Sequence, residues 1–156
     1  MYSKSGIKDY ITLFLSEADV TTGGRYTWNV PIAYYTNQRS TVCTVSIVGG
    51  SVHTTYTERG MLIDYKNGGL NSYNKHQRHI IGHGQMSDDT NNVYYIRGGI
   101  DLLVAARPDK ITLSLINEVD RLEHVASSGA LTLQFCYYDA SDVSSELHSQ
   151  FTPTLK

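Results

Sequence analysis

The run IDLLVAARPDKITLSLIN (residues 100–117), followed after a loop by LTLQFCYYD (residues 131–139), contains the clearest structural signal in the chain. Apolar and polar residues alternate in both runs, as in strands that bury one face of a sheet. Pro108 has no backbone N–H to give to a strand ladder, so Arg107-Pro108-Asp109 is expected to separate two strands. Residues 131–138 are partly apolar on both faces, which predicts a strand contacted on each side.

The same alternation recurs in shorter runs along the rest of the chain. Together with the segments above it predicts eight or nine strands: residues 11–15, 26–30, 43–47, 61–65, 79–81, 93–96, 100–104, 111–116 and 131–138. The glycine pairs at 23–24, 49–50, 68–69 and 98–99 are expected to end strands, and Gly82 and Gly84 to bend or end the short run before them. Helical segments are limited to single turns. The pattern predicts an all-β antiparallel sandwich or barrel.

Length, composition and net charge limit the number of domains and the classes of partner that the chain can have. The chain has 156 residues, 40% of them hydrophobic, and a net charge of −2. We expect one sandwich domain over residues 1–139 and a polar C-terminal tail over residues 140–156. So small a charge argues against nucleic acid as the main partner. Residue runs long enough to span a bilayer are absent, so we expect a soluble protein without a transmembrane segment. Cys43 and Cys136 lie in apolar runs and are predicted to be buried thiols.

The sequence lacks the residue patterns that are typical of catalytic and metal-binding sites. His79 and His83 have the spacing of a helical zinc site, but on a strand they would lie roughly 13 Å apart. A His-x-His pair, a Gly-x-Ser-x-Gly elbow and a glycine-rich loop opening a helix do not occur. We therefore expect a protein that is not an enzyme, with no catalytic residues, cofactor or metal.

Twelve tyrosines are the most unusual part of the composition. Several occur as adjacent pairs, at residues 34–35, 94–95 and 137–138. Neighbours on a strand point to opposite faces, so one member of a pair is expected in the core and the other outside it. The outer members could form a carbohydrate platform, a subunit contact or ordinary strand surface, and the pattern leaves these alternatives open.

The segment IRGGIDLLVAARPDKITLSLIN (96–117) with GALTLQFCYYD (129–139) resembles the closing strands of jelly-roll capsid proteins from tailless double-stranded DNA viruses, including virophages and giant viruses. In that family a strand ending near Arg-Pro leads into an Ile-x-Ile-x-Leu-type strand, and a Leu-x-Leu-x-Phe-x-Tyr strand closes the sheet. The resemblance covers about a third of the chain and implies a single jelly roll. Major capsid proteins of the lineage carry two, so it implies a penton (vertex) or minor capsid protein. The insertion or spike domain of many pentons does not fit here.

This resemblance implies a structural capsid protein of the virion, made in the host cytoplasm or viral factory. It would assemble as a homopentamer beside a double-jelly-roll major capsid protein. The candidate subunit-interface residues are Tyr34, Tyr35, Arg39, Tyr94, Arg97, Arg107, Tyr138 and Phe151. The tail holding Phe151 is a candidate inter-subunit arm. The alternative is a carbohydrate- or receptor-binding sandwich module, such as a fibre head or a lectin-like domain.

Overall fold

The computed structural model describes residues 4–54, 60–67, 78–88 and 93–138. Antiparallel strands form nearly all of the regular secondary structure in this part of the chain, together with two single turns of 3-10 helix. The elements in chain order are β1 (Lys4–Phe14), η1 (Leu15–Glu17), β2 (Val20–Thr22), β3 (Arg25–Asn29), η2 (Ile32–Tyr34), β4 (Val42–His53), β5 (Gly60–Tyr65), β6 (Ile80–Asp88), β7 (Val93–Gly98), β8 (Leu102–Ala105), β9 (Lys110–Asn117) and β10 (Ser128–Tyr138).

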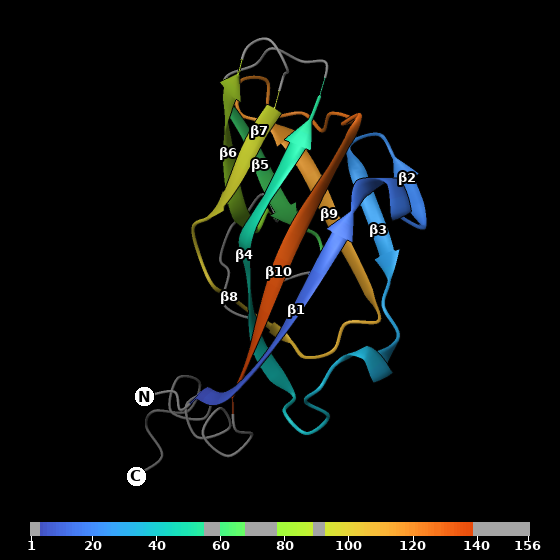
Figure 1. Cartoon of the computed structure of the whole chain (residues 1–156), viewed down its shortest axis with the longest axis vertical. Coiled ribbons are helices and arrows are strands. Elements are labelled where there is room, and N and C mark those ends of the chain that lie inside the picture. The colour runs from blue at the N-terminus through green and yellow to red at the C-terminus, as the bar shows by residue number, and fades with distance from the viewer. Residues whose placement is uncertain (1–3, 55–59, 68–77, 89–92, 139–156) are drawn as a thin grey trace, which may run out of the picture.

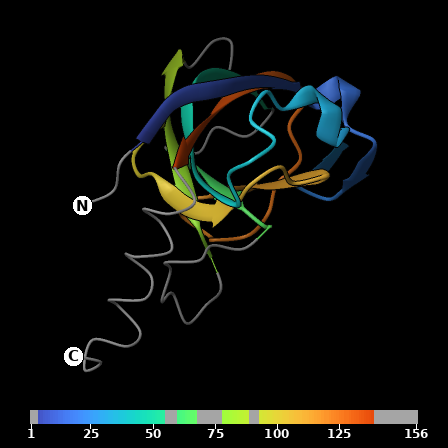
Figure 2. The ribbon, with the colours of Figure 1, turned by 90° about the horizontal axis from the view of Figure 1, so that it is seen from below.

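The strands form two layers that face each other. The hydrogen-bonded order is β1-β10-β4-β7-β6-β5-β9-β3-β2, with β8 paired to the start of β4. The sheet folds over between β7 and β6, so β1, β10, β4 and β7 lie in front of β6, β5, β9 and β3 in Figure 1. Figure 2 shows the two layers from below. The buried hydrophobic side chains of the core come from both layers. This arrangement is a single jelly roll, as predicted, closed by strands far apart in sequence.

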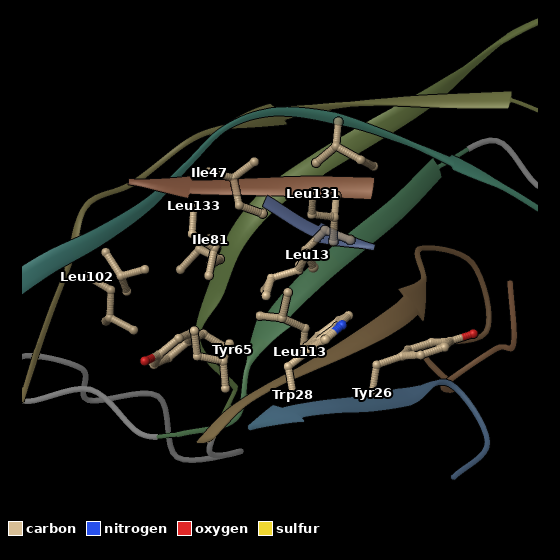
Figure 3. Close-up of a cluster of buried hydrophobic side chains, with 14 of the residues drawn as sticks. Leu13, Tyr26, Trp28, Ile47, Tyr65, Ile81, Leu102, Leu113, Leu131 and Leu133 are labelled. Atoms are coloured by element: carbon tan, nitrogen blue, oxygen red, sulfur yellow. The ribbon is translucent and has the colours of Figure 1, made fainter. Parts of the chain in front are cut away.

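Strand β10 lies in the middle of the front layer, paired to β1 on one side and to β4 on the other. Its alternating residues Leu131, Leu133, Phe135 and Tyr137 are fully buried in the core. Because strand side chains alternate between faces, the residues between them point away from the core. Figure 3 shows Leu131 and Leu133 against side chains from both layers.

The opposite layer completes the core with aromatic residues. Tyr26 and Trp28 on β3 are buried with ring centroids 6.2 Å apart. The indole Nε1 of Trp28 donates to the carbonyl oxygen of Phe14 at 2.9 Å, which joins the edge of the front layer to the back layer. The Tyr26 hydroxyl accepts from the backbone N–H of Ala126 at 3.0 Å. Both aromatic side chains therefore bury their rings and satisfy their polar atoms.

The expectation that Gly49-Gly50 ends a strand is wrong. Strand β4 continues through Gly49-Gly50, where Val48 and Gly49 together oppose Thr132 in a β-bulge. Strand β6 continues through Gly82 and Gly84, so these glycines do not end it, but its register shifts beside Gly82, where Ile63 pairs with Gly82 and Asp64 with Ile80. Gly50, Gly82 and Gly84 make room for a close neighbour rather than ending the ladder. A Cβ on Gly82 would lie 2.6 Å from the side chain of Ile47.

Strand β2 was not predicted, and it brings the total in the described residues to ten instead of eight or nine. It has three residues, all exposed, so it shows no alternation between a buried and an exposed face. The two cysteines are buried free thiols, as expected. Strands β4 and β10 are neighbours, but Cys43 pairs with Tyr137 and Cys136 with Thr44. The two thiols therefore point to opposite faces of the sheet, and a disulfide between them is geometrically disfavoured.

Gly50 and Gly49 form a matched pair for testing the bulge. A Cβ on Gly50 would lie 2.4 Å from the carbonyl oxygen of Ala130, and its φ is +149°. A Cβ on Gly49 would meet nothing within 4 Å. We predict that Gly50→Ala lowers the free energy of unfolding by about 2 kcal/mol or more and that Gly49→Ala costs well under half of that, as measured by urea denaturation. Equal losses in the two variants would contradict the bulge geometry.

Candidate functional site

Residues 30–41, here called the braced loop, connect β3 in the back layer to β4 in the front layer. The loop contains η2 and lies at the lower end of the sandwich in Figure 1, where β1 begins and β10 ends. It starts with a backbone hydrogen bond from Val30 N to Asp109 O at 2.8 Å. Four of the predicted interface residues belong to this loop or contact it.

Tyr34 and Tyr35 divide between surface and core as predicted, but they lie in and directly after the 3-10 turn η2, and not on the strand from which this was predicted. Tyr35 is 2% exposed, its ring meets Phe135 edge-on at 5.7 Å, and its hydroxyl donates to Pro108 O at 2.7 Å. Tyr34 is 73% exposed, and Ile32, two residues earlier in η2, is half exposed. The buried ring therefore anchors the loop and holds an aromatic and an aliphatic side chain in solvent.

A buried carboxylate holds the middle of the braced loop. Asp9 on β1 points inward and accepts from Tyr137 Oη at 2.5 Å, from Thr36 Oγ1 at 2.8 Å and from Thr36 N at 3.0 Å. Three donors offset much of the cost of burying a carboxylate. Sequence analysis missed Asp9. The available signal was an acidic residue two positions before Ile11 and four before Leu13, on the face that enters the core.

Arg107 and Asn37 hold the other side of the loop. Arg107 Nη1 donates to Ser40 O at 2.6 Å and to Asn37 O at 3.0 Å. Asn37 Oδ1 accepts from the backbone N–H groups of Arg39 and Ser40, each at 2.9 Å. Arg107 itself has a left-handed backbone, with φ at +54°. The braced loop is thus held from both layers, and Arg39 is left exposed on it.

The buried thiol and phenol groups behind the loop, Cys43, Tyr35 and Tyr137, retain their protons at neutral pH. Burial raises the pKa of the Cys43 thiol to about 12. Burial and, next, the hydrogen bond to Asp9 raise the pKa of Tyr137 above its usual value, and burial does the same for Tyr35. A protonated, buried thiol is a poor nucleophile. This arrangement can hold a shape and donate hydrogen bonds, and it offers no activated nucleophile.

A second loop, residues 117–126, is braced by its own side chains at the upper end of the sandwich (Figure 1). Asn117 Oδ1 accepts from Val119 N at 2.7 Å, and Asp120 Oδ1 accepts from Leu122 N at 2.8 Å. His124 Nε2 lies 2.7 Å from Asp120 Oδ2. These contacts hold three exposed aliphatic side chains in a fixed loop: Val119, Leu122 and Val125.

The remaining predicted interface residues lie away from the braced loop. Arg97 is exposed on β7. Tyr94 is 1% exposed and faces the core, and Tyr138 is buried in a small second cluster with Val42 and Leu103. Phe151 lies outside the described residues.

Three of the interface candidates therefore need correction. Tyr35, Tyr94 and Tyr138 are buried by the chain itself and have little surface to offer a neighbour. Both members of the pair 137–138 are buried, although alternation alone predicted that one would lie outside. Among the predicted interface residues, Tyr34, Arg39 and Arg97 are exposed and remain candidates for a subunit contact. Arg107 instead hydrogen-bonds the backbone of the braced loop.

Charged clusters elsewhere are internally paired. Asp64 is fully buried and accepts from His79 N at 2.7 Å. The Lys66 ammonium lies 2.8 Å from its second carboxylate oxygen but off the direction of a hydrogen bond, so that contact is electrostatic. Glu123 pairs with Arg25 at 2.7 Å. In the described residues no group of three His, Cys, Asp or Glu side chains is placed to hold a metal ion.

No protein-family model matches the chain, and no curated protein matches its sequence. None of the described helices has the length and apolar character needed to cross a membrane. The fold and the two loops with exposed apolar side chains are therefore the features that bear on function.

The Asp9 network is tested by removing one partner at a time. Tyr137→Phe removes a donor to a buried carboxylate and is expected to lower the free energy of unfolding by about 1.5–3 kcal/mol. Asp9→Ala also leaves the backbone N–H and the hydroxyl of Thr36 without their acceptor, and it should lower the free energy of unfolding by at least as much. Tyr10→Phe, on the outer side of the same β1 strand, is the control and should change stability by less than about 0.5 kcal/mol. Urea denaturation measures all three, and a Tyr137→Phe variant as stable as the wild type would refute the network.

The raised pKa values predict alkaline instability. Cys43, Tyr35, Tyr65 and Tyr137 keep their protons in the folded chain, whereas in the unfolded chain the thiol loses its proton near pH 9 and the phenols near pH 10. Their contribution to stability is complete below pH 9 and is lost as the pH rises toward 12, at up to about 1.4 kcal/mol per pH unit for each group. Urea denaturation at increasing pH, with tyrosinate absorbance, should show this fall. If every tyrosine titrates normally while the protein stays folded, the burial argument fails.

Proposed function

We propose that this chain is a structural capsid subunit, the penton protein at the vertices of an icosahedral double-stranded DNA virus. It would assemble as a ring of five copies and act in the virion without catalytic activity. The observation that carries the proposal is the combination of a single jelly roll with rigid loops that expose apolar side chains at two different places. The jelly roll is a common fold of viral capsid subunits.

A closed ring needs two different contact surfaces on each subunit, because each copy meets its neighbours through heterologous contacts. The braced loop presents Ile32, Tyr34 and Arg39, and the loop at 117–126 presents Val119 and Leu122. Tyr and Arg are enriched at protein interfaces. Both loops are already ordered by their own hydrogen bonds, so contact through them costs less conformational entropy.

The same proposal includes a neighbouring double-jelly-roll major capsid protein as the partner around the ring. It also includes the tail from residue 140 onward as an arm that docks on an adjacent subunit. Synthesis would take place in the host cytoplasm or viral factory. These parts rest on the resemblance of residues 96–139 to capsid proteins and on the single-jelly-roll size of the chain.

Native mass spectrometry of the purified full chain tests the proposal. We expect a pentamer, and we expect Tyr34→Ala and Arg39→Glu each to raise the concentration needed for assembly by about tenfold or more. Tyr95→Ala serves as a matched control, because Tyr95 is similarly exposed but lies on the outer face of β7, away from both loops.

A monomer at high concentration would refute the ring, and a trimer would favour the fibre-head alternative. If the pentamer forms equally well with Tyr34→Ala and Arg39→Glu, the ring stands but the braced loop is not its contact surface.

A further inference from the structure

The outward side of the front layer, which faces the viewer in Figure 1, is exposed at its upper end and buried at its lower end. At the upper end Phe14 and Tyr95 are 46% and 59% exposed, as expected of a sheet face that nothing covers. At the lower end Cys136, Thr44 and Leu103 are only 4%, 7% and 6% exposed. The same face is therefore open above and covered below.

Strand register makes the buried residues neighbours on this face. Thr44 on β4 pairs with Cys136 on β10 and with Leu103 on β8. Strand side chains alternate between faces, and the residues that alternate with these point into the main core. Leu103 also joins a small cluster that is separate from that core. The five residues of this surface, here called the lower patch, are Val42, Thr44, Leu103, Cys136 and Tyr138.

No element of the described ranges packs across the lower patch. Strands β1, β10, β4 and β8 are successive neighbours in one layer, so none of them crosses the outward side of another. The braced loop contacts the inward side of this layer, through Tyr35 on Phe135. The Gln134 amide donates to Cys136 Sγ at 2.8 Å and shields part of that thiol, but Thr44 and Leu103 lie beyond it. Burial of the lower patch therefore requires a segment outside the described residues.

Three such segments are attached far from the lower patch. Residues 55–59 and 89–92 join strands at the upper end, where His53 pairs with Val93. Residues 68–77 follow β5 and lead back to β6, both in the back layer. These three connections are poorly placed to cover the lower end of the front layer.

The C-terminal segment starts in the lower patch itself, because residues 139–156 follow directly from Tyr138. Phe151 comes 13 residues after Tyr138. An extended chain of that length reaches up to roughly 43 Å, so Phe151 can lie over any part of the patch. Residues 1–3 also start at this corner, since Lys4 pairs with Tyr138, but they span at most roughly 10 Å.

Charge and hydrophobicity of the tail match the lower patch. Exposed Lys8 borders the patch, where it pairs with Cys136. The part of the tail next to Tyr138, residues 139–146, contains three acidic residues and no Lys or Arg. Phe151 lies beyond this acidic stretch and supplies an apolar ring to an apolar cluster.

We propose that residues 139–156 fold back over the lower patch of their own chain in the unassembled subunit, with Phe151 packed against Val42, Leu103 and Tyr138. Contact removes apolar surface of the ring and of the cluster from water. The tail is then stored on its own subunit and has to leave the patch before it can reach a neighbour. Only this release depends on the ring proposed above, and the fold-back does not.

Thiol labelling of the full-length protein with iodoacetamide tests the fold-back, because Cys136 lies in the patch and Cys43 in the main core. Peptide mass spectrometry distinguishes the two sites, and the protein is diluted until native mass spectrometry shows a monomer. Phe151→Ala should raise the labelling rate of Cys136 by about tenfold or more, because loss of a buried ring increases the fraction of open chains. Cys43 should keep its rate, which reports that the core is intact.

Phe14→Ala is the matched control, since it removes an exposed phenylalanine at the other end of the same face. It should leave the labelling of Cys136 unchanged, and so should Tyr2→Ala. Faster labelling in Tyr2→Ala alone would assign the cover to residues 1–3 and overturn the proposal.

Other results would overturn the fold-back as well. These are an unchanged Cys136 rate in Phe151→Ala, an equal rise at both thiols, or a wild-type Cys136 that labels as fast as in urea. Protection that appears only as the protein concentration rises would assign the cover to a neighbour's tail. A protected Cys136 in a protein that never forms a ring would support the fold-back and reject the ring, so the two proposals fail separately.

Discussion

The register of β10 between β1 and β4 is the constraint on which the other features depend. Strand side chains alternate with a period of two, so a slip of one residue would reverse both faces of this strand. Leu131, Leu133 and Phe135 would then leave the core, and the Tyr137 hydroxyl would move away from Asp9. The bulge at Val48–Gly49 and the close backbone approach at Gly50 fit only the observed register.

The core and the braced loop are linked through this register. Tyr137 lies near the C-terminal end of β10, and its hydroxyl donates to the same Asp9 carboxylate as the hydroxyl of Thr36 in the braced loop. Packing of the strand therefore fixes the position of the loop. Arg107 then ties the same loop to the turn before β9. A rigid loop can present Tyr34 and Ile32 to a neighbour with little further ordering, which lowers the entropic cost of association. The loop at 117–126 achieves the same rigidity through its own Asx-type hydrogen bonds.

Sequence patterns predicted the strands whose two faces differ most. Residues 111–116 and 131–138 alternate clearly, and the jelly roll, the buried thiols and the split pair Tyr34–Tyr35 are confirmed. The glycine pair at 49–50 was misread because a glycine can make room for a neighbouring backbone as well as end a strand. Asp9 and the burial of Tyr138 depend on partners more than twenty residues away in the chain, so no local pattern reports them. Exposure in the folded chain, which separates Tyr34 and Arg39 from Tyr35 and Tyr94, is likewise a tertiary property.

We propose that rigid end loops of a single jelly roll join copies of this chain into a vertex ring. Single-particle electron cryomicroscopy of the purified assembly tests it most directly. The predicted result is a five-fold ring in which residues 30–41 of each copy are buried against the next copy, with the front layer of the sandwich unchanged. A ring that leaves residues 30–41 in solvent, or an assembly joined through the outer surface of β1, β10 and β4, would contradict it.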